Sequence, residues 1–368
     1  MTNAVSLAQQ ASTGVSQGFK NRIINGAMVI DQRNAGASYS QVNGAYSLDR
    51  WAGNSFDAGN QTGKFTVQQD AGGVTPPAGF NDYLGVTSSA ATSVSANGIY
   101  TIYQWIEGFN AADLNWGTAN AKTVTLSFWV RSSLTGTFGG ALQNNAGDRS
   151  YAYTYIISAA NTWEYKTITI AGAPAGTWLT TNGAGIAVRF GLGVGSNYTG
   201  TAGSWDSANY YSATGATNVV STNGATFYLT GVQLEVGSTA TSFDYRPYGT
   251  ELQLCQRYYR IRTTPAGAYI QGTNGQCVST TTAYISNMLD TMGMRASPTA
   301  TFSAGSTFRI FNASGSGIDC TAITANAFYQ DAPISANVTV SSGLVAGDAT
   351  TLVSSNGTAC TVQASAEL

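Results

Sequence analysis

The chain has 368 residues, of which 9% are charged, 43 are glycine and none is histidine, and its formal net charge is −2. The absence of histidine excludes Ser-His-Asp catalysis and histidine-ligated metals, and the lack of basic runs argues against nucleic acid as a partner. No apolar run is long enough to span a bilayer, so we expect no membrane insertion, and nothing in the sequence calls for a cofactor.

The composition favours an all-β protein that associates with copies of itself. Alternating Val and Ile, 20 Tyr, 14 Phe and many glycines indicate short strands joined by turns. A surface with few charges and small side chains has little to desolvate, and therefore suits packing against identical subunits. We therefore predict an oligomer. The alternative is an ordinary monomeric β-protein of low charge.

Residues 1–18 form a small, polar leader without the basic region and apolar core of a secretory signal. This leader is predicted to be a short N-terminal attachment segment that docks onto another protein, with a disordered end as the equal alternative. From Phe19 the character changes, and the pair Asn25-Gly26 gives a turn signal between apolar segments.

Several later segments alternate apolar and polar residues with the period of a β-strand. In 124–130 the even positions are apolar, and in 185–195 the apolar residues are Ile186, Val188, Phe190, Leu192 and Val194. Such strands bury one face, as in an antiparallel β-sandwich.

The glycines Gly191, Gly193 and Gly195 lie on the opposite face of that last strand. A nucleotide-binding loop of this spacing needs a following helix, and no helix is predicted here. We interpret these glycines as positions of close packing against the sheet.

In residues 227–236 the alternation of apolar and polar residues shifts by one position. The apolar residues are odd numbered as far as Leu229 and even numbered from Val232 to Val236. A slip of one residue would turn the apolar set to the wrong face, so we predict a β-bulge at Gly231 and burial of the even positions. The odd positions beyond the bulge are expected to face the other way: Gln233 and Glu235.

After Gly237, Phe243 and Tyr245 are expected to extend the sheet edge until Pro247 ends it. Residues 249–260 are compatible with a helical turn or a strand, and the run Glu251–Tyr259 within them is expected to couple two modules. The short strand patterns beyond it predict a second, smaller β-sandwich. The expected domains are 1–18, 19–248 and 249–368.

The four cysteines share wide, irregular spacings: Cys255, Cys277, Cys320 and Cys360. Metal sites need closer clusters, and structural disulfides need an oxidising compartment. We predict buried free thiols and no metal site.

A long aromatic loop over 195–218 carries the candidate binding residues. Aromatic rings stack on the C–H faces of sugars, and amides or carboxylates take the hydroxyl groups. The loop offers this combination in Tyr198, Trp205, Asp206, Tyr210 and Tyr211. Four further tryptophans have the same potential: Trp105, Trp116, Trp129 and Trp178. The alternative is that these aromatics pack in the core or between subunits.

Catalysis without histidine would require a pair of carboxyl groups, as in glycoside hydrolysis. The 18 acidic residues are scattered and form no motif. We therefore predict no catalytic residues.

Four segments together resemble a recurrent module of tailed-phage tail fibre or receptor-binding proteins. The segments lie between residues 19 and 260: FKNRIINGAMVIDQRN, YSLDRW, LSFWVRSSLTGTFGGAL and FYLTGVQLEVGSTATSFDYRPYGTELQLCQRYY. The last is the most distinctive. Beyond Tyr259 only the β-rich character and the SAEL ending match.

The resemblance implies a jelly-roll-like sandwich with a carbohydrate-binding character. It also implies a homotrimer that attaches to a phage tail or baseplate protein through its N-terminus. The domain at 249–368 would then be the host-facing tip. The protein would be made in the bacterial cytoplasm and located in the virion.

The expected function is therefore non-catalytic adsorption to a host-surface glycan such as lipopolysaccharide. Two alternatives stay open. One is a polysaccharide depolymerase of the tailspike type, and the other is a purely structural baseplate component that binds no receptor.

Overall fold

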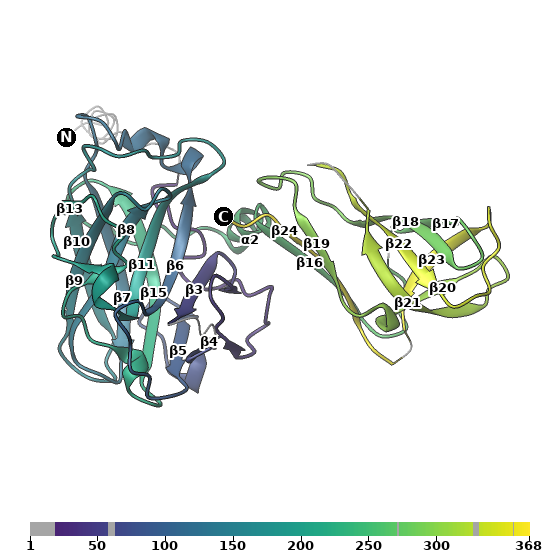
Figure 1. The fold of residues 1–368 in the computed structure, drawn as a ribbon, viewed down its shortest axis with the longest axis horizontal. Helices are drawn as coiled ribbons and strands as arrows, with labels where there is room; N and C mark the ends of the chain where they lie inside the picture. Colours follow the sequence, from purple (N-terminus) through teal and green to yellow (C-terminus); the bar gives the residue numbers. More distant parts are fainter. Residues whose placement is uncertain (1–18, 58–62, 271, 327–330, 356) are drawn as a thin grey trace, which may run out of the picture. The chain divides into compact units, whose positions relative to one another are not determined.

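The computed structural model describes residues 19–57, 63–270, 272–326, 331–355 and 357–368 (Figure 1). The predicted attachment segment 1–18 lies outside these ranges. The chain divides into two compact units, Met1–Glu251 and Leu252–Leu368, whereas the sequence placed the boundary after Tyr248. Both units are built almost wholly from antiparallel strands, which confirms the all-β fold class.

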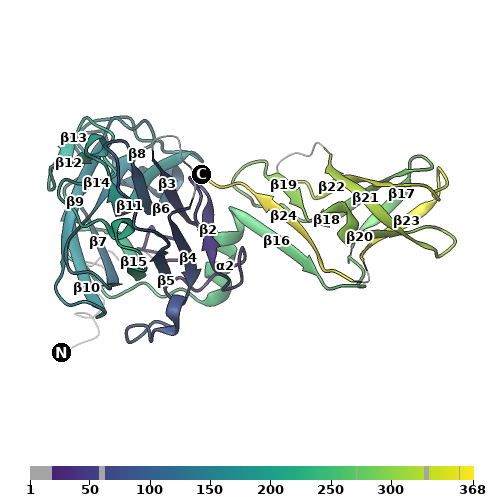
Figure 2. The same cartoon turned by 60° about the horizontal axis from the view of Figure 1, so that its bottom comes forward.

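Two antiparallel sheets make the body of the N-terminal unit (Figures 1 and 2). The six-stranded sheet has the order β1 (Tyr39–Ser40), β4 (Phe65–Gln69), β5 (Leu84–Ser88), β15 (Thr226–Val236), β7 (Val124–Ser132) and β10 (Glu164–Ile170). The seven-stranded sheet has the order β13 (Trp205–Asp206), β9 (Ser150–Ile157), β8 (Gly136–Asn144), β11 (Ala184–Val194), β6 (Ile99–Glu107), β3 (Trp51–Phe56) and β2 (Tyr46–Leu48).

Short elements connect these strands. A parallel pair joins β12 (Thr199–Gly200) to β14 (Ser212–Ala213). The described part of this unit also has short 3₁₀ turns: η1 (Ala71–Gly73), η2 (Gly108–Asn110), η3 (Ala112–Leu114), η4 (Ser196–Tyr198) and η5 (Val219–Ser221).

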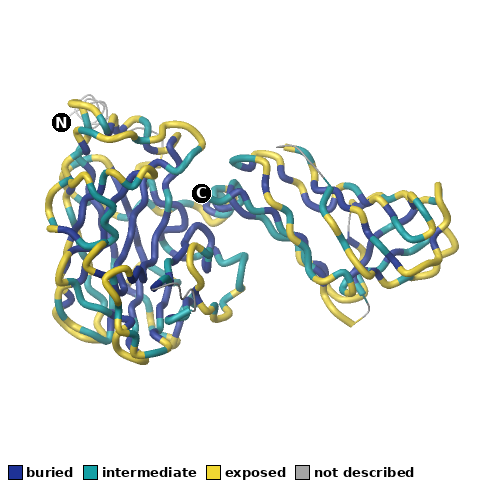
Figure 3. Tube along the Cα trace, viewed as in Figure 1, coloured by how far each residue is buried: buried dark blue, intermediate teal, exposed yellow. Residues whose placement is uncertain are grey.

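The core of the N-terminal unit lies between its two sheets, where the strands are buried in Figure 3. The predicted period of two is confirmed, because Ile186, Val188 and Phe190 of β11 are at most 1% exposed. Phe128 of β7 meets Phe190 edge to face, with ring centroids 5.0 Å apart. Each fully buried side chain of this size contributes about 1.5–3 kcal/mol through the area it removes from water.

The predicted β-bulge at Gly231 is confirmed. The pairing of β15 with β7 shifts register between Thr230 and Gln233, and Gly231 has a φ of 61°. A Cβ at this position would lie 2.6 Å from the ring of Phe80, so both the backbone and the space require glycine. The bulge keeps Val232 in the core after the shift in alternation.

Two expectations around β15 were wrong, and the orientation of Gln233 and Glu235 was confirmed. Val236 is 42% exposed, because the strand ends there beyond the core. Gln233 and Glu235 face away from the core but are buried, since residues 238–244 fold back over them. Thr241 donates to Glu235 through both its backbone N–H and its hydroxyl, at 2.8 and 2.7 Å.

The second correction concerns Phe243 and Tyr245, which add no strand to the sheet edge. The chain here curls so that both rings pack on Phe80, with centroids 5.1 and 5.5 Å away. Aromatic packing has therefore replaced backbone pairing. After this segment, α2 (Tyr248–Gln256) resolves the predicted choice between helix and strand at Glu251 in favour of a helix.

The C-terminal unit contains a three-stranded sheet and a closed six-stranded barrel. The sheet has the order β16 (Tyr259–Thr264), β24 (Cys360–Ser365) and β19 (Thr299–Phe302), with η6 (Gly305–Thr307) following β19. The barrel joins β17 (Asn274–Cys277), β18 (Thr282–Leu289), β22 (Ile334–Val340), β21 (Gly317–Ala325), β20 (Phe308–Phe311) and β23 (Ala349–Ser354).

This barrel differs in closure from the small sandwich expected from the sequence. Closure comes from β23, which pairs with both β17 and β20 and so leaves no edge between them. The four cysteines are buried thiols outside any disulfide, as predicted. Among the described residues, no helix has the length and apolar character needed to cross a bilayer.

Candidate functional site

The outer face of the seven-stranded sheet carries a buried arginine among aromatic rings. Because Val188 and Phe190 of β11 point into the core, Arg189 between them points outward. Arg189 pairs in register with Tyr103 on β6 and with Ala141 on β8. We call this surface the Arg189 face; its outward residues are Asn54, Tyr103, Trp105, Ala141, Gln143 and Arg189.

The loop 195–218 lies against the same face. Its strand β14 contacts β8, β9 and β11 (Figure 2). The loop approaches closely because a Cβ at Gly139 or at Gly191 would lie 2.6 Å from the Oγ of Ser212. The predicted role of Gly191 in close packing is therefore confirmed. A backbone hydrogen bond of 2.7 Å from Thr217 to Thr137 fixes the far end of the loop.

Aromatic rings surround the guanidinium of Arg189. Its Cζ lies 4.5 Å from the ring centroid of Tyr103, 4.4 Å from that of Tyr211 and 5.4 Å from that of Trp105. Arg189 is 4% exposed, and burial lowers its pKa from the ordinary value. Contacts of a cation with ring faces at these distances are attractive, the more so when desolvated.

Neutral amides hold the guanidinium in place. Nε of Arg189 donates to Oε1 of Gln143 at 2.8 Å, and Nη1 donates to Oδ1 of Asn54 at 3.1 Å. Asn209 of the loop accepts a hydrogen bond from Gln143 in turn. Asn54 and Asn209 are half-buried and remain accessible at the rim.

The structure brings together two of the five predicted binding residues on this face. The rings of Tyr198 and Tyr211 meet edge to face at 5.5 Å, and Tyr211 covers Arg189. The backbone N–H of Tyr210 donates a hydrogen bond to the Oγ of Ser150 at 3.1 Å. The ring of Tyr210 packs onto Gly200, which has no side chain to exclude it.

Trp205 and Asp206 are placed elsewhere, on the short edge strand β13. Trp205 packs among Trp116, Trp178 and Tyr151 with centroids 5.2, 5.5 and 5.3 Å away. Its indole N–H donates to the carbonyl of Ala171 at 2.7 Å. This Trp205 therefore closes the end of the core, as the packing alternative allowed, and Asp206 stays exposed beside it.

Sequence reasoning missed the central residue, Arg189. One signal was available, because Arg189 is a lone charge on a strand whose other outward residues are glycine or alanine. Trp105 was one of four further tryptophans with the potential to stack on a sugar. Its alignment beside Arg189 follows from the pairing of β6 with β11, which no local pattern gives.

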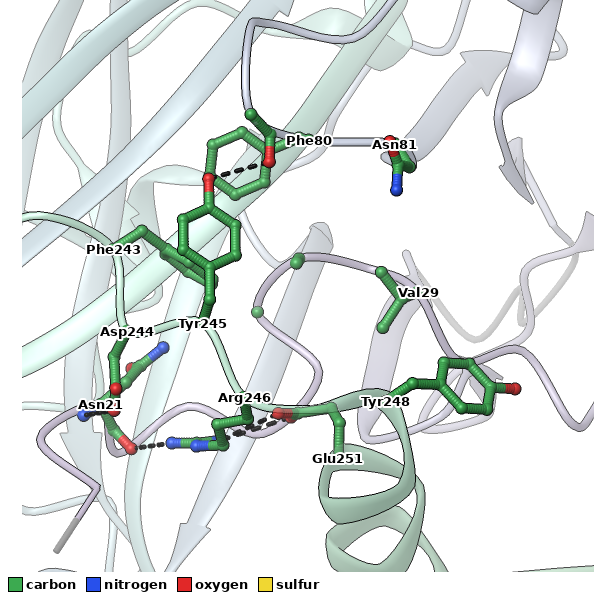
Figure 4. Close-up of a pocket in the computed structure, with 13 residues that line it drawn as sticks. Asn21, Val29, Phe80, Asn81, Phe243, Asp244, Tyr245, Arg246, Tyr248 and Glu251 are labelled. Atoms are coloured by element: carbon green, nitrogen blue, oxygen red, sulfur yellow. Dashed lines mark hydrogen bonds and ion pairs between the residues drawn. The ribbon is translucent and has the colours of Figure 1, made fainter.

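A second hollow of the N-terminal unit has a cavity volume of about 250 Å³ (Figure 4). One wall is aromatic, where Tyr245 stands between Phe80 and Phe243 and donates its hydroxyl to the carbonyl of Gly79 at 2.8 Å. Tyr248 and Val29 face it across the opening in Figure 4. An adjoining hollow of about 450 Å³ continues the aromatic wall to Trp129.

The floor of this cavity is a hydrogen-bonded ion pair. Arg246 contacts Glu251 at 3.3 Å, donates to the carbonyl of Ile23 at 3.1 Å and also donates to the carbonyl of Asn21. Glu251 accepts the backbone N–H of Asn25. These contacts connect the start of the described chain to the start of α2. The ion pair therefore has a structural role.

Asp82 lies close to Asp70 in the N-terminal unit. Burial, followed by the charge of Asp70, raises the pKa of Asp82 to about 6. Within the described residues, no group of three or more Asp, Glu or Cys side chains is arranged to hold a metal ion.

Comparisons with known proteins give likeness in structure only. No protein-family model matches the sequence, and no curated protein matches it. One similar solved structure is the enzymatically active domain of bacteriophage CBA120 tailspike protein 4. The two are 13% identical with a TM-score of 0.32, over 59% of this chain and 22% of the tailspike chain.

Two other similar structures are carbohydrate-binding modules. The family 11 module of the Clostridium thermocellum cellulase Lic26A-Cel5E is 11% identical over 55% of this chain and 97% of the module, with a TM-score of 0.27. TmCBM61, solved with β-1,4-galactotriose, is 8% identical over 51% and 88% of the two chains, with a TM-score of 0.27. The fold described above rests on the strands of this chain and not on these scores.

Proposed function

We propose that this protein binds a glycan on the Arg189 face, without catalysis, as an adsorption component of a tailed-phage virion. The observation that carries the proposal is the gathering of Trp105, Tyr198 and Tyr211 with the amides of Asn54 and Asn209 around Arg189. Rings of this kind stack on sugar C–H faces, and amides exchange hydrogen bonds with hydroxyl groups.

The virion assignment is supported by the resemblance of residues 19–260 to tail fibre modules. Low charge also suits assembly into the proposed homotrimer. Residues 1–18 would attach to a tail or baseplate protein, and the glycan would be lipopolysaccharide or another host-surface polysaccharide. Three equivalent sites raise the overall affinity by avidity, so each single site can be weak.

Glycan binding can be tested on an array and on intact host cells with the full-length protein. We expect Tyr211→Ala and Trp105→Ala to weaken binding by about 10-fold or more, as the loss of a stacking ring implies. Tyr165→Ala is the matched control, because Tyr165 is a 43% exposed ring on β10 of the other sheet. Equal losses in all three variants, or loss only in the control, would contradict the assignment to the Arg189 face.

A depolymerase is the second candidate, favoured by the raised pKa of Asp82. A general acid in glycoside hydrolysis needs such a pKa, but its partner carboxyl group stands about 5 Å or more away. Asp82 and Asp70 instead lie close enough to influence each other's charge directly. We expect no release of reducing ends from host polysaccharide; release that Asp82→Asn abolishes would establish catalysis. Absence of any binding at micromolar protein would favour a purely structural baseplate role.

A further inference from the structure

Arg189 is a buried cation without an acidic partner. It forms no ion pair with any described residue, and the described residues include every Asp and Glu of the chain. The buried Arg246 is different, because Glu251 lies 3.3 Å from it. A buried charge without a counter-charge is costly, so a site that keeps one is prepared to receive an anion.

The hydrogen bonds of Arg189 leave one of the two terminal nitrogens of its guanidinium group free. Nε donates to Gln143 and Nη1 donates to Asn54, whereas Nη2 has no hydrogen-bond partner in the part of the chain that the structure describes. The rings of Tyr103 and Tyr211 lie over the guanidinium. The edge of a guanidinium is the part that binds a carboxylate, and such charge-assisted hydrogen bonds are the strong ones.

The surroundings of Nη2 suit a sugar that carries the negatively charged group. Half-buried rings of Trp105 and Tyr198 offer stacking surfaces nearby, and the amides of Asn54 and Asn209 are neutral. A ligand placed here would therefore present an apolar face, hydroxyl groups and one negative charge together. We infer that the glycan unit bound at Arg189 is an acidic sugar whose carboxylate accepts a hydrogen bond from the edge of the guanidinium.

This inference rests on the proposed glycan binding but can fail separately from it. The probes are oligosaccharides containing glucuronate, galacturonate or 3-deoxy-octulosonate, each paired with its carboxyl-reduced form, in which CH₂OH replaces the carboxylate. Binding to the full-length wild-type protein is measured for both members of each pair. We expect at least one pair in which the acidic member binds about 10-fold or more tightly, with an affinity that falls as NaCl increases.

The variant Arg189→Gln should bring the two members of that pair to the same affinity, and Arg189→Lys should recover part of the preference. A purely structural arginine would instead lower both affinities by the same factor. Circular dichroism and the thermal midpoint of each variant show whether the fold persists. If Arg189→Gln does not fold, the wild-type pair comparison and its salt dependence decide the question.

Two results would overturn the inference while leaving glycan binding intact. One is equal binding of acidic and reduced members by the wild-type protein. The other is a preference for phosphorylated sugars over every carboxylate probe. Failure of all glycans to bind would overturn the proposed function itself.

Discussion

Arg189 and Arg246 represent two ways in which this chain buries a guanidinium. Arg246 is enclosed by Glu251 and by backbone carbonyls, and its side chain is 3% exposed. Arg189 has neutral amides and ring faces around it and keeps a free donor. The first arrangement satisfies the charge within the protein, whereas the second leaves it without a counter-charge from the described residues. At this scale, the presence or absence of a charge partner distinguishes the structural Arg246 from Arg189, for which we propose a ligand.

The ion pair of Arg246 predicts a large effect on stability. Glu251→Ala should reduce the free energy of unfolding by about 3 kcal/mol, because it leaves a buried cation unpaired. Asp113→Ala is the matched control: it also removes a carboxylate from an arginine, Arg22, but Asp113 is 50% exposed. The control should cost less than about 1 kcal/mol, since solvent screens the pair. Urea denaturation measures both, and equal costs would contradict the structural role of Glu251.

Asp82 predicts a dependence of stability on pH. Burial and Asp70 raise its folded pKa from the ordinary value of 3.8 to about 6. The folded state therefore binds this proton more tightly than the unfolded state, and the contribution of Asp82 to stability falls as pH rises between these values. Asp82→Asn should remove this slope and gain on the order of 1 kcal/mol at pH 7, after allowance for partial exposure. Thermal unfolding at pH 4 and pH 7 measures the slope, and an unchanged slope in the variant would refute the assignment.

Among the elements, β15 pairs with segments from several parts of the chain. Its first half pairs with β5 and β7, and beyond the bulge its edge receives the segment that begins at Asn21. Val232 N–H donates to the carbonyl of Gly26, and Arg22 N–H donates to that of Leu234, both at 2.9 Å. Beyond the bulge, β15 therefore forms backbone hydrogen bonds with a segment from the start of the described chain.

Replacing the bulge glycine tests this role. Gly231→Ala combines a positive φ with a clash against Phe80 and should cost about 2–4 kcal/mol. Gly224→Ala has a similar φ of 76° but meets nothing within 4 Å, so it should cost only about 1 kcal/mol. Chemical denaturation separates the two effects. If Gly224→Ala costs as much as Gly231→Ala, backbone strain alone explains the glycine.

Among the described residues, each compact unit has its own main hydrophobic core. The first lies between the two sheets and includes Trp51 and Trp116, with Trp178 and Trp205 packed against it. The second fills the barrel and the small sheet, and includes Cys277, Cys320 and Cys360. Burial raises the pKa of the Cys320 thiol to about 12, which keeps it protonated and unreactive at neutral pH. Each unit therefore has the apolar interior that a folded domain requires.

The proposed trimer is a prediction about the assembled protein. Light scattering on the full-length chain should give a mass about three times 38.2 kDa, because the low surface charge favours association of identical copies. The mass should persist when NaCl is raised, since few charges contribute to such contacts. A monomeric mass at micromolar concentration would contradict the trimer and the avidity that depends on it.

Local sequence patterns were sufficient for the fold class, the strands of the first core and the bulge at Gly231. They succeed because the side-chain period of a strand and the conformational needs of glycine are properties of a few neighbouring residues. Other outcomes depended on contacts between distant segments. Phe243 and Tyr245 left the sheet edge for Phe80, Trp205 joined the core, and the C-terminal strands closed into a barrel.

The Arg189 face belongs to this second class. Tyr103, Arg189 and Tyr211 come from β6, β11 and the loop after it, and strand pairing together with the close approach of the loop at Gly191 brings them together. Sequence composition indicated that aromatic and amide side chains were present in the loop. The tertiary structure decided which of them share a surface, and it placed among them a buried cation whose charge no described residue neutralises.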